Sequence, residues 1–168
     1  APGSLCRALT EHGQAQARWV CLRSDVGQYQ QMPFAIDLCW LRQREEALHV
    51  IEQADLLHLH NFIDLDSRQF QPVDFRQLWQ QGRPMVRQFH SQPGLVAQVM
   101  QQPEETVQAC PIPKLVIAQY PERGYPTAAL VRNLVYVPPH TPRPLATGRP
   151  LRVGYAPSRF NSAHSSRW

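Results

Sequence analysis

The segment ADLLHLHN (residues 54–61) alternates leucine with histidine over four consecutive positions. Side chains two residues apart in a strand point to the same face of a sheet. We therefore predict a strand over residues 56–60 that carries His58 and His60 on one face. His58 lies deeper in this strand, whereas His60 and Asn61 lie at its carboxyl end.

The surrounding sequence repeats this pattern of short apolar strands separated by helices. Further strands are expected at residues 17–22, 85–89, 115–118 and 151–155, and helices at residues 3–13, 40–53, 73–81, 94–102 and 126–130. Ser4 is expected to cap the first helix, and Gly13 to follow its end. Strands that alternate with helices of roughly ten residues indicate an α/β fold. The sequence thus predicts a Rossmann-like open parallel sheet with helices on both faces.

A change in composition near the end of the chain predicts two domains. Residues 138–150 contain proline, threonine and glycine but almost no large apolar side chain, which is typical of a linker. Residues 1–137 are therefore predicted to form one domain, and residues 151–168 to begin a second one. Because no strand precedes the first helix and the second unit stops early, we expect the fold to be incomplete at both ends.

The composition is that of a globular protein whose positive charge comes from arginine. Hydrophobic residues make up 43% and charged residues 18% of 168 residues, close to globular averages. The net charge is +4, and Lys114 is the only lysine. Arginine suits phosphate groups, which leaves a nucleotide or peripheral contact with an anionic membrane open. Nucleic acid is not expected, because the arginines are dispersed and form no stripe of alternating basic and aromatic residues.

The cysteines and the apolar segments bound the cellular setting. The four cysteines are scattered without a CxxC pair, so we expect reduced, packed thiols rather than a zinc or redox motif. No apolar run approaches the roughly 18 residues of a membrane-spanning helix, and the N-terminus lacks the layout of a signal peptide. A cytoplasmic location is therefore expected.

Polar residues follow three of the predicted strands. His60 and Asn61 end one strand, His90 and Ser91 end the next, and Asn133 lies near a later one. In open parallel sheets, ligands bind outside the carboxyl ends of the strands. These residues are therefore expected to face one open crevice.

Four sequence motifs occur in an order that is known from one enzyme superfamily. ADLLHLHN is similar to the pattern aDxvHxHn, GRPMVRQFHS to gkPvvxtxHd, and YPTAALVRN to yPxaxxvxN. LRVGYAPSR is similar to the first strand and turn of a donor-binding domain. On these motifs, most of the chain from about residue 54 onward resembles the N-terminal, acceptor-side domain of a GT-B glycosyltransferase, particularly the retaining, family 4-like enzymes.

The resemblance implies transfer of a sugar from a nucleotide-sugar donor to a hydroxyl group of a glycan, a lipid or a small molecule. It implies no metal ion and no cofactor, and it leaves the oligomeric state open. His90 is the expected catalytic residue, acting by hydrogen bonding and electrostatic help rather than by nucleophilic attack. The residues expected to bind substrate are Gly3, His60, Asn61, Ser91 and Asn133, and Arg159 is expected to contact the donor diphosphate.

The chain also departs from the family pattern. Ser91 stands where many members carry aspartate, so a carboxylate that would orient the histidine or the sugar is replaced by a hydroxyl group. The sequence stops at Trp168, before the Lys-Gly segment and the acidic donor motif. On this basis, the chain alone is expected to be an inactive fragment.

Two other functions remain open at this stage. The first is a non-catalytic sugar-binding or scaffolding module with the same fold. The second is a metal hydrolase that uses His58, His60 and His90, although no further ligand appears at helical spacing. A simpler interpretation, which argues against metal binding, is that His58 is a packed, hydrogen-bonded core histidine. Tyr120, Arg123 and Tyr125 form a small polar and aromatic cluster that is expected to lie in a surface loop.

Overall fold

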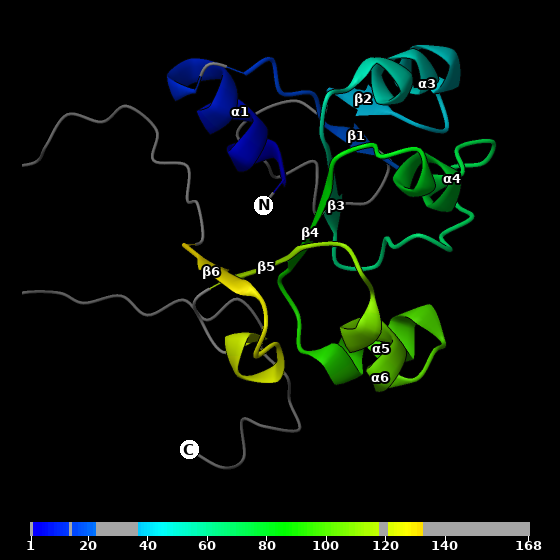
Figure 1. Cartoon of the computed structure of the whole chain (residues 1–168). Coiled ribbons are helices and arrows are strands. Elements are labelled where there is room, and N and C mark those ends of the chain that lie inside the picture. The colour runs from blue at the N-terminus through cyan, green and yellow to red at the C-terminus, as the bar shows by residue number, and fades with distance from the viewer. Residues whose placement is uncertain (1, 14, 23–36, 118–120, 133–168) are drawn as a thin grey trace, which may run out of the picture. The chain divides into compact units, whose positions relative to one another are not determined.

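The computed structural model describes residues 2–13, 15–22, 37–117 and 121–132, in which helices alternate with short strands. In chain order the elements are α1 (Pro2–His12), β1 (Val20–Cys21), β2 (Leu38–Cys39), α3 (Arg44–Gln53), β3 (Leu57–His60), α4 (Phe75–Gln80), β4 (Met85–Phe89), α5 (Pro93–Met100), α6 (Glu104–Ala109), β5 (Lys114–Ile117), the 3-10 helix η1 (Pro121–Gly124) and β6 (Ala129–Val131) (Figure 1). The α/β class predicted from the sequence is confirmed.

Four strands form one parallel sheet in the order β3-β4-β5-β6, and β1 and β2 form a separate parallel pair. In the larger sheet, His60 lies opposite Gln88 and Phe89 lies opposite Val116. The three predicted strands at 56–60, 85–89 and 115–118 are all parallel, and their ends fall within one residue of the prediction.

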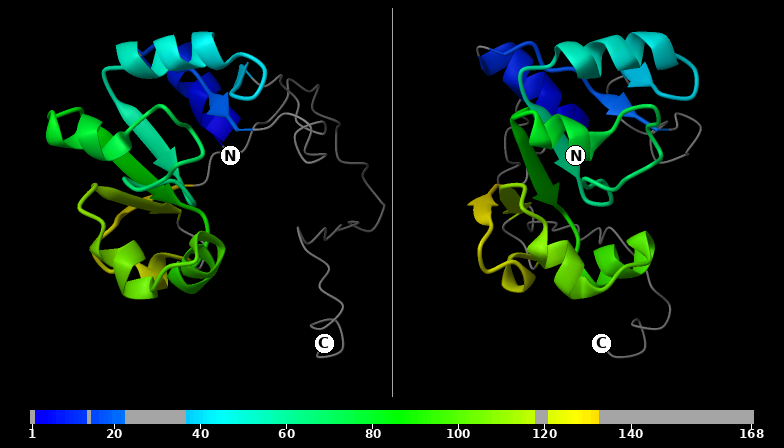
Figure 2. Two further views of the ribbon diagram at one scale, coloured as in Figure 1. Left: turned by 90° about the vertical axis from the view of Figure 1, so that its right-hand side faces the viewer. Right: turned by 45° about the vertical axis from the view of Figure 1, so that its right-hand side comes forward.

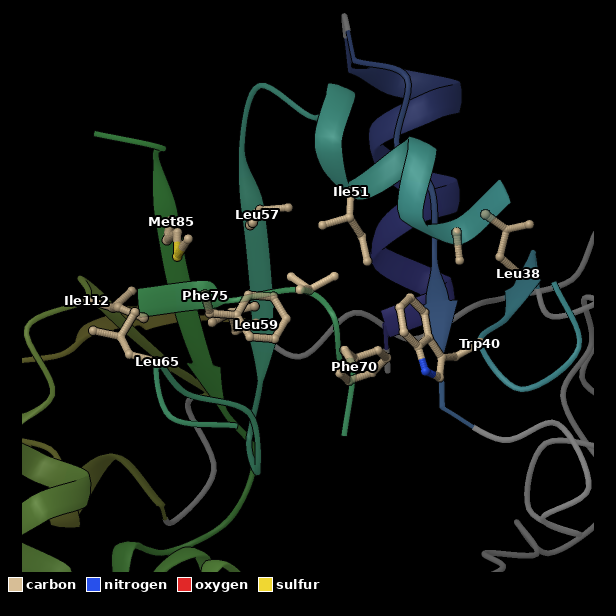
Figure 3. Packing of buried hydrophobic residues seen from close by; sticks show 12 residues of the cluster. Leu38, Trp40, Ile51, Leu57, Leu59, Leu65, Phe70, Phe75, Met85 and Ile112 are labelled. Carbon is tan, nitrogen blue, oxygen red and sulfur yellow. The ribbon is translucent and has the colours of Figure 1, made fainter. Parts of the chain in front are cut away.

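The main hydrophobic core lies between one face of β3 and β4 and the helices α3 and α4. Leu57, Leu59 and Met85 point into it from the strands, Ala47 enters from α3 and Phe75 from α4. Figure 3 shows how side chains from these elements and from the loop after β3 fill one continuous cluster. Its buried members are Leu38, Trp40, Ala47, Ile51, Leu57, Leu59, Leu65, Phe70, Val73, Phe75, Met85 and Ile112.

A second core lies further along the same face of the sheet. Phe89, four residues after Met85 on β4, packs with Val96 of α5, Val107 of α6 and Val116 of β5. The two helices lie side by side in both views of Figure 2. Because each strand is added to the same edge of the sheet by a right-handed crossover, the helices that connect β3 to β4 and β4 to β5 fall on one face.

Helix α1 packs on the face of the β1–β2 pair that is opposite to the face covered by α3. Cys6 of α1 contacts a small cluster of Trp19, Cys21 and Cys39. Burial and the nearby Asp37 carboxylate raise the pKa of the Cys6 thiol to about 11, so that it stays protonated. The described helices α3 to α6 cover one face of the four-stranded sheet, whereas α1 packs on the separate β1–β2 pair, so helices on both faces of one sheet stay a prediction.

The start of α1 differs from the prediction. The helix begins at Pro2, so Ser4 lies inside it and does not cap it. Proline is favoured in the first turn, where its missing N–H would have no partner in any case. Gly3 lies buried in this first turn. The N–H of Gly13, just beyond the helix, donates to the Leu9 carbonyl at 3.0 Å, as expected of a residue that ends a helix.

Three other elements were missed or wrongly predicted. The sequence pattern did not indicate β2 or α6, which are only two and six residues long. The helix expected at residues 126–130 is wrong, because Ala129–Val131 forms β6 and pairs with β5. Pairing with a neighbouring strand supplies backbone hydrogen bonds that outweigh a weak local helical preference.

Some predictions concern residues outside the described part of the chain. They are the linker, the second domain with its strand at 151–155, Asn133 and Arg159. None of the described helices combines the length and the apolar composition that crossing a membrane requires.

Packing between η1 and the start of α5 is close enough to test by mutation. A Cβ atom at Gly124 would lie 2.5 Å from Pro93 Cδ, whereas one at Gly94 would meet only the Glu104 carboxylate, at 3.2 Å. We expect Gly124→Ala to lower the free energy of unfolding by about 1–3 kcal/mol, because the proline ring cannot move aside. Gly94→Ala, inside α5, should be neutral or stabilising. Urea denaturation of both variants measures this, and equal stabilities would contradict the packing described.

Candidate functional site

The carboxyl ends of β3 and β4 bring four of the predicted site residues together. His60 Nδ1 lies 3.2 Å from His90 Nε2. The Asn61 side chain accepts a hydrogen bond from the His90 backbone N–H at 2.6 Å and donates one to Ser91 Oγ at 3.2 Å. The expected proximity of these residues is therefore present. That they line an open crevice stays a prediction.

Asn61 connects the end of β3 to the end of β4 through both its backbone and its side chain. Its φ of 42° lies in the left-handed region, which asparagine tolerates better than most residues. Its N–H donates to the Gln88 carbonyl at 2.9 Å. Because both polar groups of its side chain already bind His90 and Ser91, Asn61 holds the second strand end in place.

Arg87 lies on the face of the sheet opposite to the histidines and binds the backbone of Asn61. This role was not predicted from the sequence. The side chain is fully buried, and its guanidinium donates to the Asn61 carbonyl from Nε at 3.3 Å and from Nη2 at 2.8 Å. Its charged group also lies 4.7 Å from the centre of the Phe89 ring. Among the described residues, no carboxylate pairs with Arg87 and its Nη1 has no partner. A signal was available, because an arginine between the inward-facing Met85 and Phe89 breaks an apolar face.

Tyr125 supports the end of β4 from another direction. The expectation of a surface loop is wrong for this residue, because its side chain is only 3% exposed. Its ring stacks on Phe89 with centroids 4.1 Å apart, and its hydroxyl group donates to the Ser91 carbonyl at 3.0 Å. Burial raises the pKa of the Tyr125 hydroxyl, so it remains a neutral donor. The backbone that presents His90 and Ser91 is thus held by Asn61 and Tyr125.

Three histidine rings stack in a row on the opposite face of the sheet from Arg87. The ring centroids of His58 and His60 are 4.6 Å apart, and those of His60 and His90 are 5.4 Å apart. Burial, followed by repulsion from the neighbouring rings, lowers the pKa of His60 to about 3. Burial also lowers the pKa of His90, to about 4, and the pKa of His58. All three rings are therefore neutral near pH 7.

His58 is half-buried rather than fully packed in the core, and its side chain hydrogen-bonds to Gln88. Its buried Nε2 atom has no partner among the described residues. In the described residues, no group of three or more histidine, cysteine, aspartate or glutamate side chains is placed to hold a metal ion. The histidine row is thus a stack of neutral rings, each of which can donate or accept a hydrogen bond.

Two other parts of the structure make no contact with this cluster that the described residues show. No hydrogen bond or ring contact in the described part of the chain joins Gly3 to it. An open surface depression is lined by Asp55 and residues 81–84, near the amino end of β4. In this depression, Arg83 donates to the carbonyls of Glu52 and Ala54 and so caps the carboxyl end of α3. The depression lies at the opposite end of the strand from His90.

Comparison of the chain with models of protein families, with curated proteins and with solved structures found no match. The geometry of the site and the sequence motifs are therefore the basis for inferring the function.

Replacement of Asn61 tests its role in joining the two strand ends. Asn61→Ala should lower the free energy of unfolding by about 2 kcal/mol, because the His90 N–H loses its acceptor and alanine is strained in the left-handed region. Asn61→Gly should cost about 1 kcal/mol less, since glycine adopts this conformation freely. Asn61→Asp, which keeps the acceptor oxygen, is the matched control. If denaturant unfolding gave all three variants the same stability as the parent chain, Asn61 would not have this role.

The stacked histidines predict a pH dependence of stability. Their folded-state pKa values lie below that of an unfolded histidine, so the unfolded chain binds more protons between about pH 4 and pH 6.5. The free energy of unfolding should therefore be highest above pH 6.5 and fall on acidification, by roughly 2–4 kcal/mol at pH 4 after allowance for partial exposure. His60→Asn should reduce this fall, whereas replacing the exposed His49 of α3 with Gln should not. Equal slopes for all three chains would show that the rings are not held neutral by the fold.

Proposed function

We propose that this chain is the acceptor-side domain of a GT-B glycosyltransferase, which transfers a sugar from a nucleotide sugar to a hydroxyl acceptor. The observation that supports this proposal is the contact of His60, Asn61, His90 and Ser91 at the carboxyl edge of a parallel sheet. Ligands of open α/β folds bind at this edge. Two of the motifs that resemble the family end at these residues.

The chemistry of the cluster suits the binding of oxygen-rich substrates. A partly exposed, neutral imidazole can donate or accept one hydrogen bond at a substrate oxygen without carrying a charge. His90 is held at its backbone by Asn61 and at its ring by His60. A hydrogen-bonding group held in this way contributes to catalysis when it contacts an oxygen atom whose charge changes during the reaction.

Other classes of reaction find less support in the cluster. Covalent catalysis needs a nucleophile beside a general base, and Ser91 Oγ accepts a hydrogen bond from an amide group rather than donating to a histidine. General-base catalysis at neutral pH needs a pKa near 7, whereas that of His90 is about 4. Sugar transfer in which the histidine positions reacting groups requires neither.

Transfer activity in the full-length gene product tests the proposal. We expect His90→Ala to reduce transfer from the active member of a panel of nucleotide sugars by roughly 10²-fold, the range for loss of one preorganised donor. His49→Ala, on the exposed side of α3, is the control and should leave the rate unchanged. The far-ultraviolet circular dichroism of both variants should match that of the parent protein.

The outcomes separate the proposed enzyme from its alternative. Transfer that depends on His90 supports a glycosyltransferase. Sugar binding without transfer in the full-length protein would favour a non-catalytic module, and neither binding nor transfer with any member of the panel would overturn the proposal.

A further inference from the structure

The hydrogen bond between the two neutral rings contains one proton, and its direction decides what His90 offers to a substrate. We infer that His60 is a positioning residue that donates its Nδ1–H to His90 Nε2 and thereby leaves the single proton of His90 on Nδ1. In this arrangement His90 presents an N–H donor to an oxygen atom of the bound molecule. The inference deepens the proposed function and rests on it only for the identity of that molecule.

Proton counting leaves two arrangements for the pair. Each neutral imidazole carries one N–H, and the contact of 3.2 Å joins Nδ1 of His60 to Nε2 of His90. If His60 donates, then His90 keeps its proton on Nδ1 and His60 Nε2 is a bare acceptor. If His90 donates instead, then the proton of His60 moves to Nε2 and His90 Nδ1 becomes the bare acceptor.

The surroundings of His60 favour the first arrangement. Among the described residues, no group hydrogen-bonds to His60 Nε2. An N–H group without a protein partner is less costly on a ring that solvent reaches than on a more enclosed one, and buried N–H groups without a partner are rare in native structures. His60 is more deeply buried than His90. The proton that lacks a protein partner is therefore better placed on the more accessible ring of His90.

The geometry around His90 gives this tautomer a fixed direction. The rings of His60 and His90 lie at 22° to each other, and the His90 backbone N–H is held by the Asn61 side chain at 2.6 Å. In the described part of the chain, nothing hydrogen-bonds to His90 Nδ1. Contacts thus occupy one face of the His90 ring and its backbone N–H, while Nδ1 remains available to a ligand. An N–H donor suits an oxygen with available lone pairs, such as a sugar hydroxyl or a phosphate oxygen.

The tautomer can be read directly in the chain without any substrate. In ¹⁵N-labelled protein at pH 7, two-bond ¹H–¹⁵N correlation spectra distinguish a protonated from an unprotonated ring nitrogen. We expect His90 to show a protonated Nδ1 and a bare Nε2, the reverse of the tautomer that an unconstrained neutral histidine favours. A protonated Nε2 on His90 in the parent chain would overturn the inference at once.

A matched pair of histidines isolates the role of His60. His58 and His60 share one face of β3 and stack on each other, but only His60 contacts His90. His60→Leu should return His90 to the Nε2–H tautomer, whereas His58→Leu should leave it unchanged. His60→Asn provides an amide N–H close to the position of Nδ1–H and should retain the unusual tautomer. If all three variants gave the same His90 spectrum, His60 would have no positioning role.

Activity separates a failure of this inference from a failure of the proposed function. In the full-length protein, His60→Leu should lower kcat by about 10- to 100-fold, as expected when a group that orients a functional histidine is lost, and His60→Asn should restore most of it. The predicted tautomer in a protein that transfers no sugar would leave the inference standing and count against the proposed function. Transfer that is insensitive to both His60 variants would overturn the positioning role, whatever sugar is transferred.

Discussion

The register of β3 against β4 determines how the residues at the carboxyl ends of these two strands meet. His60 lies opposite Gln88, and so the chain that leaves β4 presents His90 and Ser91 beside the residues that leave β3. Because side chains in a strand alternate between faces, a slip of one residue would move the histidines into the leucine core. The core prevents such a slip, since Leu57, Leu59 and Met85 pack together on the other face. The same hydrophobic contacts that stabilise the sheet therefore set the distance between the two rings.

Polar groups at this edge carry costs that the surrounding fold offsets. Arg87 is a fully buried cation, and its interactions with the Asn61 carbonyl and the Phe89 ring offset only part of the cost of removing it from water. Asn61 is held in a left-handed conformation, and three imidazole rings are kept neutral by burial. Such local costs are common at functional sites, where placement of a group matters more than stability. Their concentration at one edge of this sheet is what distinguishes it from the rest of the described molecule.

The sequence predicted the strands of this site well because their signals are local. Alternation at residues 57–60 is enough to assign a strand and to place both histidines on one face. The contacts that build the site are not local: Asn61 bonds to His90, 29 residues later, and Tyr125 to Ser91, 34 residues earlier. No periodicity within one segment reports such partners, which explains why Tyr125 was assigned to a surface loop. The edge strand β6 was missed for a related reason, since its three residues are ordered by pairing with β5.

The low pKa of His90 also limits the catalytic roles that this residue could have. A ring with a pKa of about 4 binds a proton weakly at pH 7, so it is a poor general base for a hydroxyl group. As a hydrogen-bond donor the neutral ring has no such disadvantage, because its remaining N–H is retained throughout the physiological pH range. A protonated His90 would attract an anionic substrate more strongly, but burial and the neighbouring His58 ring oppose that charge. Under the proposed function, the site would place one neutral hydrogen-bond donor against a substrate oxygen atom, and its action would depend on where the ring is held rather than on its titration.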